Sequence, residues 1–154
     1  MIKLIVAMDK NNLIGKNGSL PWHYSKDLKF FKRSTLNHTI VMGEETFKSI
    51  LAINAQPLKN RHTVVATLTG YTYPGIETTN NIIEYLKNTK EDVYICGGKT
   101  IYLLTYKMCD ELLITYIDKE HDGDIYLDLD LSGFYMVEEH IEDEILHFRR
   151  YIKR

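Results

Sequence analysis

Asp27 is the residue whose type and position most clearly point to chemistry. The apolar periodicity predicts a helix over residues 25–36, with Ser25 as its N-cap. At about 100° per residue, Asp27 falls on the apolar face, which also carries Leu28, Phe30, Phe31, Ser34 and Thr35. A buried carboxylate needs a partner, or its pKa shifts. The position indicates a carboxylate that meets a ligand, although an acid in a first turn can also simply stabilise the helix dipole.

Two predicted strand-to-helix junctions contain glycine, the first at Gly43 and the second at Gly97-Gly98. A glycine there lets the backbone approach a phosphate, which helix N-terminal N–H groups can then bind. Neither junction has the six-residue dinucleotide fingerprint, and a tight turn explains either glycine alone equally well. Two such junctions at one end of a sheet favour a ligand with two adjacent phosphates.

The segment from Asn11 to Trp22 is a long loop that follows the first predicted strand. It contains Gly15 and Gly18 together with four apolar residues, Leu13, Ile14, Leu20 and Trp22. A merely solvated loop would not contain these apolar residues. Long loops at the carboxyl end of a strand are often lids over a site. The alternative is a loop that these side chains anchor to the core.

The composition excludes several classes of function. The chain has 154 residues and a formal net charge of -2, without a long basic block, so it lacks the electrostatic signature of a protein that binds duplex nucleic acid. No apolar run approaches the ~20 residues that span a bilayer, and the N-terminal segment predicts a strand rather than a signal peptide. Cys96 and Cys109 suit a reduced, cytoplasmic compartment. Neither the histidines nor the acids from Asp118 to Asp128 have a metal-site spacing, so we expect no metal.

Strand and helix patterns alternate along most of the chain. Strands are predicted at 2–8, 39–42, 62–67, 92–96 and 111–117, helices at 25–36, 44–51, 81–88 (capped by Thr79 or Asn80) and 99–106, and a hairpin at 135–153. This alternation predicts a single α/β domain over residues 1–154, with a mainly parallel sheet. The hairpin must add an antiparallel edge. Ligands bind beyond the carboxyl ends of such strands, which places the loop after residue 8, Gly43, Thr67 and Gly97-Gly98 around one cleft.

Taken together, these residues resemble the dihydrofolate reductase family over essentially the whole chain. The motifs that carry the resemblance are Leu13 to Trp22, Asp27-Leu28 with Phe31-Lys32, Met42-Gly43 with Thr46-Phe47 and Ser49-Ile50, Pro57-Leu58 with Asn60-Arg61, Gly97-Gly98 with Ile101-Tyr102, Thr115-Tyr116-Ile117 and Gly123-Asp124. The resemblance implies a twisted sheet of about eight strands with helices on both faces. It also implies hydride transfer from NADPH to C6 of dihydrofolate, with a proton added at N5.

The resemblance implies roles on the substrate side. Asp27 would accept the N–H edge of a pterin, as a carboxylate can accept two such bonds in one plane. Arg61 would bind the substrate's α-carboxylate in a bidentate manner, with Lys32 as a weaker contact. Trp22 and Thr115 would hold Asp27 and a water in place. The apolar walls would be Ile5, Leu20, Leu28, Phe31 and Ile50.

On the cofactor side, the resemblance implies that Ala7, Ile14, Gly97 and Tyr102 surround the nicotinamide. Thr46, Gly98 and Lys99 would meet the pyrophosphate. The remaining residues expected to line the cofactor are Gly15, Gly18, Gly43, Thr67, Thr100 and Ile101.

Two residues depart from the family's pattern. Glu44 stands where the family usually has an arginine that meets the adenosine 2'-phosphate, and Leu68 stands near a position that is often serine. A glutamate repels a phosphate, so we expect weaker discrimination of NADPH from NADH. Lys99, Thr67 and Thr69 are the neighbours that could compensate.

Two alternatives and one default accompany this interpretation. A related reductase could act on another heterocycle, such as a ribosylaminopyrimidine, although Asp27 and Arg61 together fit a pteroylglutamate better. A non-catalytic member of the fold could serve as a binding or structural component, and Glu44 is the feature that would favour it. A monomer is the default, because no surplus apolar stripe calls for a partner.

Overall fold

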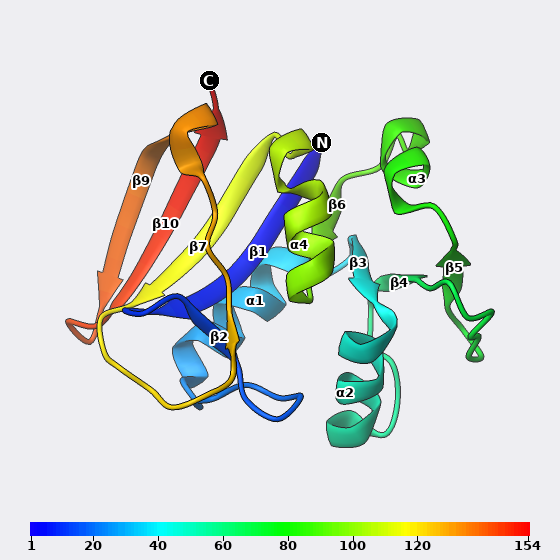
Figure 1. The fold of residues 1–154 in the computed structure, drawn as a ribbon, viewed down its shortest axis with the longest axis horizontal. Coiled ribbons are helices and arrows are strands. Elements are labelled where there is room, and N and C mark those ends of the chain that lie inside the picture. The colour runs from blue at the N-terminus through cyan, green and yellow to red at the C-terminus, as the bar shows by residue number, and fades with distance from the viewer.

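The computed structural model describes residues 1–154 and is built around an eight-stranded sheet in the order β5-β4-β3-β6-β1-β7-β10-β9 (Figure 1). The strands are β1 (Ile2–Asp9), β3 (Thr39–Gly43), β4 (His62–Ala66), β5 (Glu77–Thr79), β6 (Val93–Ile95), β7 (Glu111–Ile117), β9 (Phe134–Glu142) and β10 (Leu146–Lys153). A separate two-stranded sheet pairs β2 (Leu13–Gly15) with β8 (Ile125–Tyr126). The helices are α1 (Ser25–Thr35), α2 (Glu44–Asn54), α3 (Ile82–Asn88) and α4 (Lys99–Thr105).

The strand directions confirm the α/β prediction. The pairs from β5 to β7 are all parallel, whereas β10 is antiparallel to both β7 and β9. In the terminal hairpin Arg149 pairs with Glu139 and Arg150 with Glu138, each at 2.7 Å. Acidic side chains of β9 therefore face basic side chains of β10, which helps to fix the register of the hairpin.

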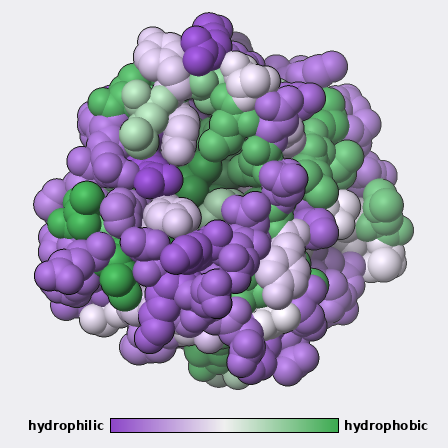
Figure 2. Space-filling view, turned by 60° about the vertical axis from the view of Figure 1, so that its left-hand side comes forward, coloured by the Kyte–Doolittle hydropathy of each residue, from purple (hydrophilic) through white to green (hydrophobic).

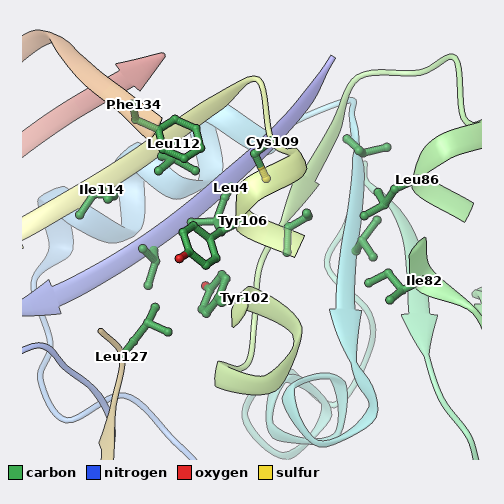
Figure 3. Close-up of a cluster of buried hydrophobic side chains, with 14 of the residues drawn as sticks. Leu4, Ile82, Leu86, Tyr102, Tyr106, Cys109, Leu112, Ile114, Leu127 and Phe134 are labelled. Atoms are coloured by element: carbon green, nitrogen blue, oxygen red, sulfur yellow. The ribbon is translucent and has the colours of Figure 1, made fainter. Parts of the chain in front are cut away.

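Helices cover both faces of the sheet, as predicted, because successive strand residues point to opposite faces. Leu4 belongs to a cluster of 16 buried residues on the face of α3 and α4, where Tyr102 and Tyr106 point toward the strands (Figure 3). The next residue, Ile5, belongs to a second cluster that packs against Phe30 and Phe31 of α1 and against residues of α2. Figure 1 shows α1 behind the strands and α4 in front of them.

Several predicted boundaries are wrong. Ser25 is the first residue of α1 and not its cap, because Tyr24 is the N-cap and makes no capping hydrogen bond through its side chain. For α3 the cap is Asn81, whose side chain accepts a hydrogen bond from the Glu84 N–H, and not Thr79 or Asn80. The α2 helix continues past Leu51 to Asn54. Strands β2, β5 and β8 were not predicted, because each has only two or three residues and, unlike β6, lies in a segment that its polar and glycine residues marked as a loop or turn.

None of the helices is both long enough and apolar enough to cross a membrane. On the face shown in Figure 2, hydrophobic side chains gather in a recessed area in the upper middle of the view, with hydrophilic side chains around it.

Candidate active site

The two glycine junctions lie side by side at the carboxyl ends of β3 and β6. The Gly43 N–H donates to the Gly97 carbonyl at 2.9 Å, and the Gly97-Gly98 peptide is cis. Gly97 has a φ of 122°, which a residue with a side chain rarely adopts. A Cβ on Gly98 would lie 3.2 Å from the Thr46 hydroxyl. The helices that start here, α2 and α4, have no side-chain cap, so no capping side chain satisfies their first backbone N–H groups.

Asp27 is a buried carboxylate without a cationic partner. Asp27 is only 8% exposed, and it takes part in none of the ion pairs in the structure. Burial raises the pKa of Asp27, and a hydrogen bond from the Thr115 hydroxyl on β7 opposes that shift. Thr115 pairs in register with Ala7 of β1. Thr115 thus connects Asp27 to the strand position beside Ala7, which is expected on the cofactor side, and the charge of Asp27 remains available to a ligand.

Tyr102 connects the glycine junction to β1. Its hydroxyl donates to the Ile5 carbonyl at 2.8 Å and lies 3.4 Å from the position that a Cβ on Gly97 would occupy. The pKa of Tyr102 lies well above its usual value, mainly because the phenol is buried. Electrostatic interactions with Cys96 and Asp27 add smaller shifts in the same direction. The phenol thus stays protonated, and it joins residues expected on the cofactor side to residues expected on the substrate side.

The predicted lid loop is fixed at two points. The Gly18 carbonyl accepts a 2.6 Å hydrogen bond from the Ser49 hydroxyl of α2. On the other side, the Asp124 N–H donates to the Gly15 carbonyl at 3.0 Å, and the Asn17 N–H donates to the Asp124 carboxylate at 3.1 Å. Ile14 lies in β2 and packs against the larger core cluster.

Apolar side chains are exposed beside the lid. Leu20 at the end of the loop is 51% exposed and Leu28 on α1 is 40% exposed. Phe31 and Ile50 are half-buried and pack against the smaller core cluster. The indole N–H of Trp22 is buried and finds no acceptor in the protein. With Ile5 of β1, the predicted wall residues therefore lie in β1, the lid, α1 and α2.

Arg61 stands just before β4, against the end of α1. Its Nη1 donates to the Thr35 hydroxyl at 3.2 Å, and its Nε donates to the Lys59 carbonyl at 2.9 Å. Thr35 in turn donates to the Phe31 carbonyl at 2.8 Å. The guanidinium is thereby oriented beside the face of α1 that carries Phe31. Three other predicted residues, Lys32, Lys99 and Thr100, are exposed and make no side-chain hydrogen bond within the protein.

Glu44 forms a hydrogen-bonded cluster at the start of α2. Its carboxylate accepts from Thr67 at 2.6 Å, from Thr69 at 2.7 Å and from Lys48 at 2.7 Å. The Lys48 ammonium and then the two hydroxyls lower the pKa of Glu44 to about 2. The threonine hydroxyls therefore support the negative charge of Glu44. The neighbouring cation is Lys48, one helical turn along, and not Lys99. Leu68 is 89% exposed.

Comparisons with known proteins agree over nearly the full chain. A family model described as Dihydrofolate reductase matches residues 1–151. The chain belongs to the dihydrofolate reductase family. The dihydrofolate reductase of Bacillus subtilis is 37% identical over 80% of this chain and 73% of the relative, and that of Mycoplasma genitalium is 31% identical over 100% and 99%. The solved dihydrofolate reductase of Enterococcus faecalis, complexed with NADP(H) and RAB-propyl, is 31% identical, covers 98% of this chain and 93% of its own, and has a TM-score of 0.83.

In this member of the dihydrofolate reductase family, a second buried carboxylate escaped the sequence analysis. Asp9 is fully buried at the end of β1, where it accepts hydrogen bonds from the N–H groups of Asn11, Leu13 and His121 at 2.8, 3.0 and 2.9 Å. An aspartate that directly follows an apolar strand and precedes a turn is the signal that could have identified it. No sequence signal indicates that His121, 112 residues further along, is its neighbour.

Proposed function

We propose that this chain reduces 7,8-dihydrofolate to 5,6,7,8-tetrahydrofolate with NADPH as the donor. Family membership supports the reaction, and the relative solved with NADP(H) supports the donor. The observation that supports it most strongly is Asp27, a buried carboxylate that has a hydroxyl neighbour and no cation. A ligand with a donor edge that becomes cationic during the reaction supplies the missing partner.

Asp27 binds and polarises the substrate in this proposal. A pterin presents adjacent N–H donors, and a carboxylate accepts two of them in one plane. Its negative charge favours the form of the substrate that is protonated at N5, in which C6 is electron-poor and accepts hydride. The Thr115 hydroxyl holds the carboxylate in orientation. The pterin and benzoyl rings lie against the apolar walls that Ile5, Leu20, Leu28, Phe31 and Ile50 provide.

Arg61 binds the α-carboxylate at the far end of the substrate. Thr35 and the Lys59 carbonyl occupy Nη1 and Nε, which fixes the plane of the guanidinium. Pairing with a carboxylate suits a pre-oriented arginine better than a lysine. Lys32 on the exposed side of α1 adds a weaker charge.

The residues around the glycine junction fit a dinucleotide. Bound NADPH supplies the hydride. Ala7, Ile14, Gly97 and Tyr102 orient the nicotinamide ring, and Thr46, Gly98 and Lys99 bind the pyrophosphate with the N–H groups at the start of α2 and α4. The further residues that contact the cofactor in this proposal are Gly15, Gly18, Gly43, Thr67, Thr100 and Ile101.

The proton reaches N5 through the lid side of the cleft. Leu20 and Trp22 control which water enters, and the free indole N–H of Trp22 can orient it. Asp27 sets the protonation equilibrium of the substrate but is not the direct donor. This division of roles makes Asp27, Leu20, Trp22 and Thr115 the catalytic group.

The wider context follows from the same proposal. Residues 1–154 form one domain that works as a monomer in the cytoplasm. NADPH is used with reduced preference over NADH, because the ionised Glu44 faces the region expected to receive the 2'-phosphate.

The direct test is the absorbance of NADPH at 340 nm with purified protein and dihydrofolate. We expect a steady loss of absorbance that requires both compounds. A folded protein without a rate above background would refute the enzymatic proposal and favour a binding or structural role. A rate with a ribosylaminopyrimidine but none with dihydrofolate would instead favour the related reductase.

A further inference from the structure

His121, in the loop after β7, lies at the centre of a cluster that joins three segments distant in sequence. Its Nε2 lies 2.8 Å from the Tyr24 hydroxyl, and its ring packs on Trp22 with centroids 5.0 Å apart. Its backbone N–H donates to the Asp9 carboxylate at 2.9 Å, and its Nδ1 lies 3.6 Å from the same group. The His121 side chain is 13% exposed and that of Asp9 is 0% exposed.

The His121 ring is held on one side only. Its Nδ1 is buried and has no hydrogen-bond partner, because 3.6 Å to the Asp9 carboxylate is too long for a hydrogen bond. Its Nε2 makes the 2.8 Å hydrogen bond with the Tyr24 hydroxyl. Burial and the Asp9 charge both raise the pKa of Tyr24, which keeps that hydroxyl protonated. Asp9 thus holds the backbone of His121, and the ring of His121 holds the Tyr24 hydroxyl.

Tyr24 carries this arrangement to the active site. It is the N-cap residue of α1, yet its side chain makes no capping bond to the helix. Its carbonyl accepts from the N–H groups of Asp27 and Leu28, both at 3.1 Å. The hydroxyl of Tyr24 is thus fixed by His121 while its backbone holds the turn of the helix that contains the buried carboxylate.

We propose that His121 is a positioning residue for the reduction of dihydrofolate: through Tyr24 and Trp22, it fixes the first turn of α1 and the end of the lid relative to the substrate. The inference rests on the proposed function. It assigns His121 no contact with substrate or cofactor. It therefore predicts an effect on substrate binding and on the environment of Trp22 rather than on cofactor binding.

Tyr24→Phe and His121→Phe test the proposal, because each removes polar atoms and keeps a ring. Loss of one buried hydrogen bond changes an equilibrium constant by about threefold to tenfold. Each variant should therefore raise the KM for dihydrofolate by about that factor. The KM for NADPH should change by less than about twofold. The double variant should show no further loss, because both changes break the same contact. Tyr135→Phe and His140→Phe, on the exposed strand β9, are the matched controls.

Trp22 is the only tryptophan, so its fluorescence reports this cluster without any turnover. Tyr24→Phe should shift Trp22 emission through His121, because the His121 ring contacts both the Trp22 ring and the Tyr24 ring. Unchanged emission and unchanged dihydrofolate KM in Tyr24→Phe, or additive effects in the double variant, would overturn the proposal. A native protein that binds NADPH but does not reduce dihydrofolate would refute the proposed function instead, and the emission shift would still test the cluster.

Discussion

Asp27 of α1 and Glu44 of α2 are carboxylates whose surroundings shift their pKa values in opposite directions. Burial without a cation raises the pKa of Asp27. Lys48, Thr67 and Thr69 lower that of Glu44 to about 2. A ligand that donates hydrogen bonds to Asp27 therefore stabilises its ionised form, which the protein alone leaves without a cation. Glu44 is an acceptor that the protein already satisfies, so it has little to gain from a ligand.

The raised pKa of Asp27 predicts how stability depends on pH. The folded-state pKa of Asp27 lies above 3.8, the usual value that the unfolded chain keeps. The contribution of this group to the free energy of unfolding is therefore fully present below pH 3.8 and is lost as the pH rises through the folded-state pKa. An asparagine side chain cannot ionise, so Asp27→Asn should raise the melting temperature of the ligand-free protein at neutral pH. The gain should disappear in acid, below the ordinary aspartate pKa. Calorimetry of both proteins across this range would measure it, and a lower melting temperature for Asp27→Asn at pH 7 would contradict the account.

The Glu44 cluster predicts a test of cofactor choice. Native kcat/KM for NADPH should exceed that for NADH by less than about tenfold, since an ionised carboxylate repels the extra phosphate. Glu44→Arg should raise that ratio by about tenfold or more, because arginine binds phosphate in a bidentate manner. Glu45→Arg is the matched control, because Glu45 is a 90% exposed neighbour that makes no contact with Thr67. A strong NADPH preference in the native protein would count against this role of Glu44.

Individual residues of the site could be predicted where side-chain type and helix geometry limit the chemistry. The helix geometry placed Asp27 on the buried face, and its burial is confirmed. The charge of Glu44 was recognised, but Lys48 was not, because only the folded rotamers show which lysine reaches it. Asp9, Tyr24 and His121 were missed because their contacts link segments as much as 112 residues apart.

At the scale of elements, the lid contains a short strand, β2, and its neighbours hold it in place. β2 pairs with β8, and the loop between β7 and β8 crosses it closely enough that a Cβ on Gly123 would lie 2.6 Å from the Gly15 carbonyl. The apolar residues of this loop predicted a lid over a site, with anchoring to the core as the alternative, and Ile14 does pack against the larger core cluster. They did not predict its partner, because a two-residue strand carries no periodic signal.

Gly123→Ala tests this contact between the lid and the loop. The new methyl group meets backbone that cannot rotate away, so we expect a loss of about 1–3 kcal/mol of unfolding free energy, together with weaker NADPH binding. Gly133→Ala is the control, because a Cβ there meets nothing within 4 Å. Urea unfolding of the three proteins gives the comparison. Equal stability of the two variants would show that the lid does not pack on this loop as the structure describes.

At the scale of the whole molecule, the alternation of strands and helices was enough to predict the architecture. Parallel strands need crossover connections, and the helical segments between them supplied these. The terminal hairpin could be placed as an antiparallel edge because two adjacent strands with a tight turn cannot be parallel. The strand order was beyond reach, because it depends on which buried faces fit together across the sheet.

One sheet with a core on each face predicts one cooperative unit. Denaturant unfolding followed by Trp22 fluorescence and by far-ultraviolet circular dichroism should give coincident transitions. Sedimentation of the native protein should give the mass of one 18.0 kDa chain. Two separated transitions would contradict the single domain, and a concentration-dependent mass would contradict the monomer.

The central claim is that Asp27 binds and polarises dihydrofolate, and turnover of Asp27→Asn tests it most directly. Asparagine keeps the shape of the side chain but removes its charge and places a donor where the pterin also donates. We expect turnover near neutral pH to fall by about a hundredfold or more, while the Kd for NADPH stays within about twofold of the native value. Turnover that stays within about twofold of native, in a variant that is folded and binds NADPH, would show that the carboxylate does not have this role.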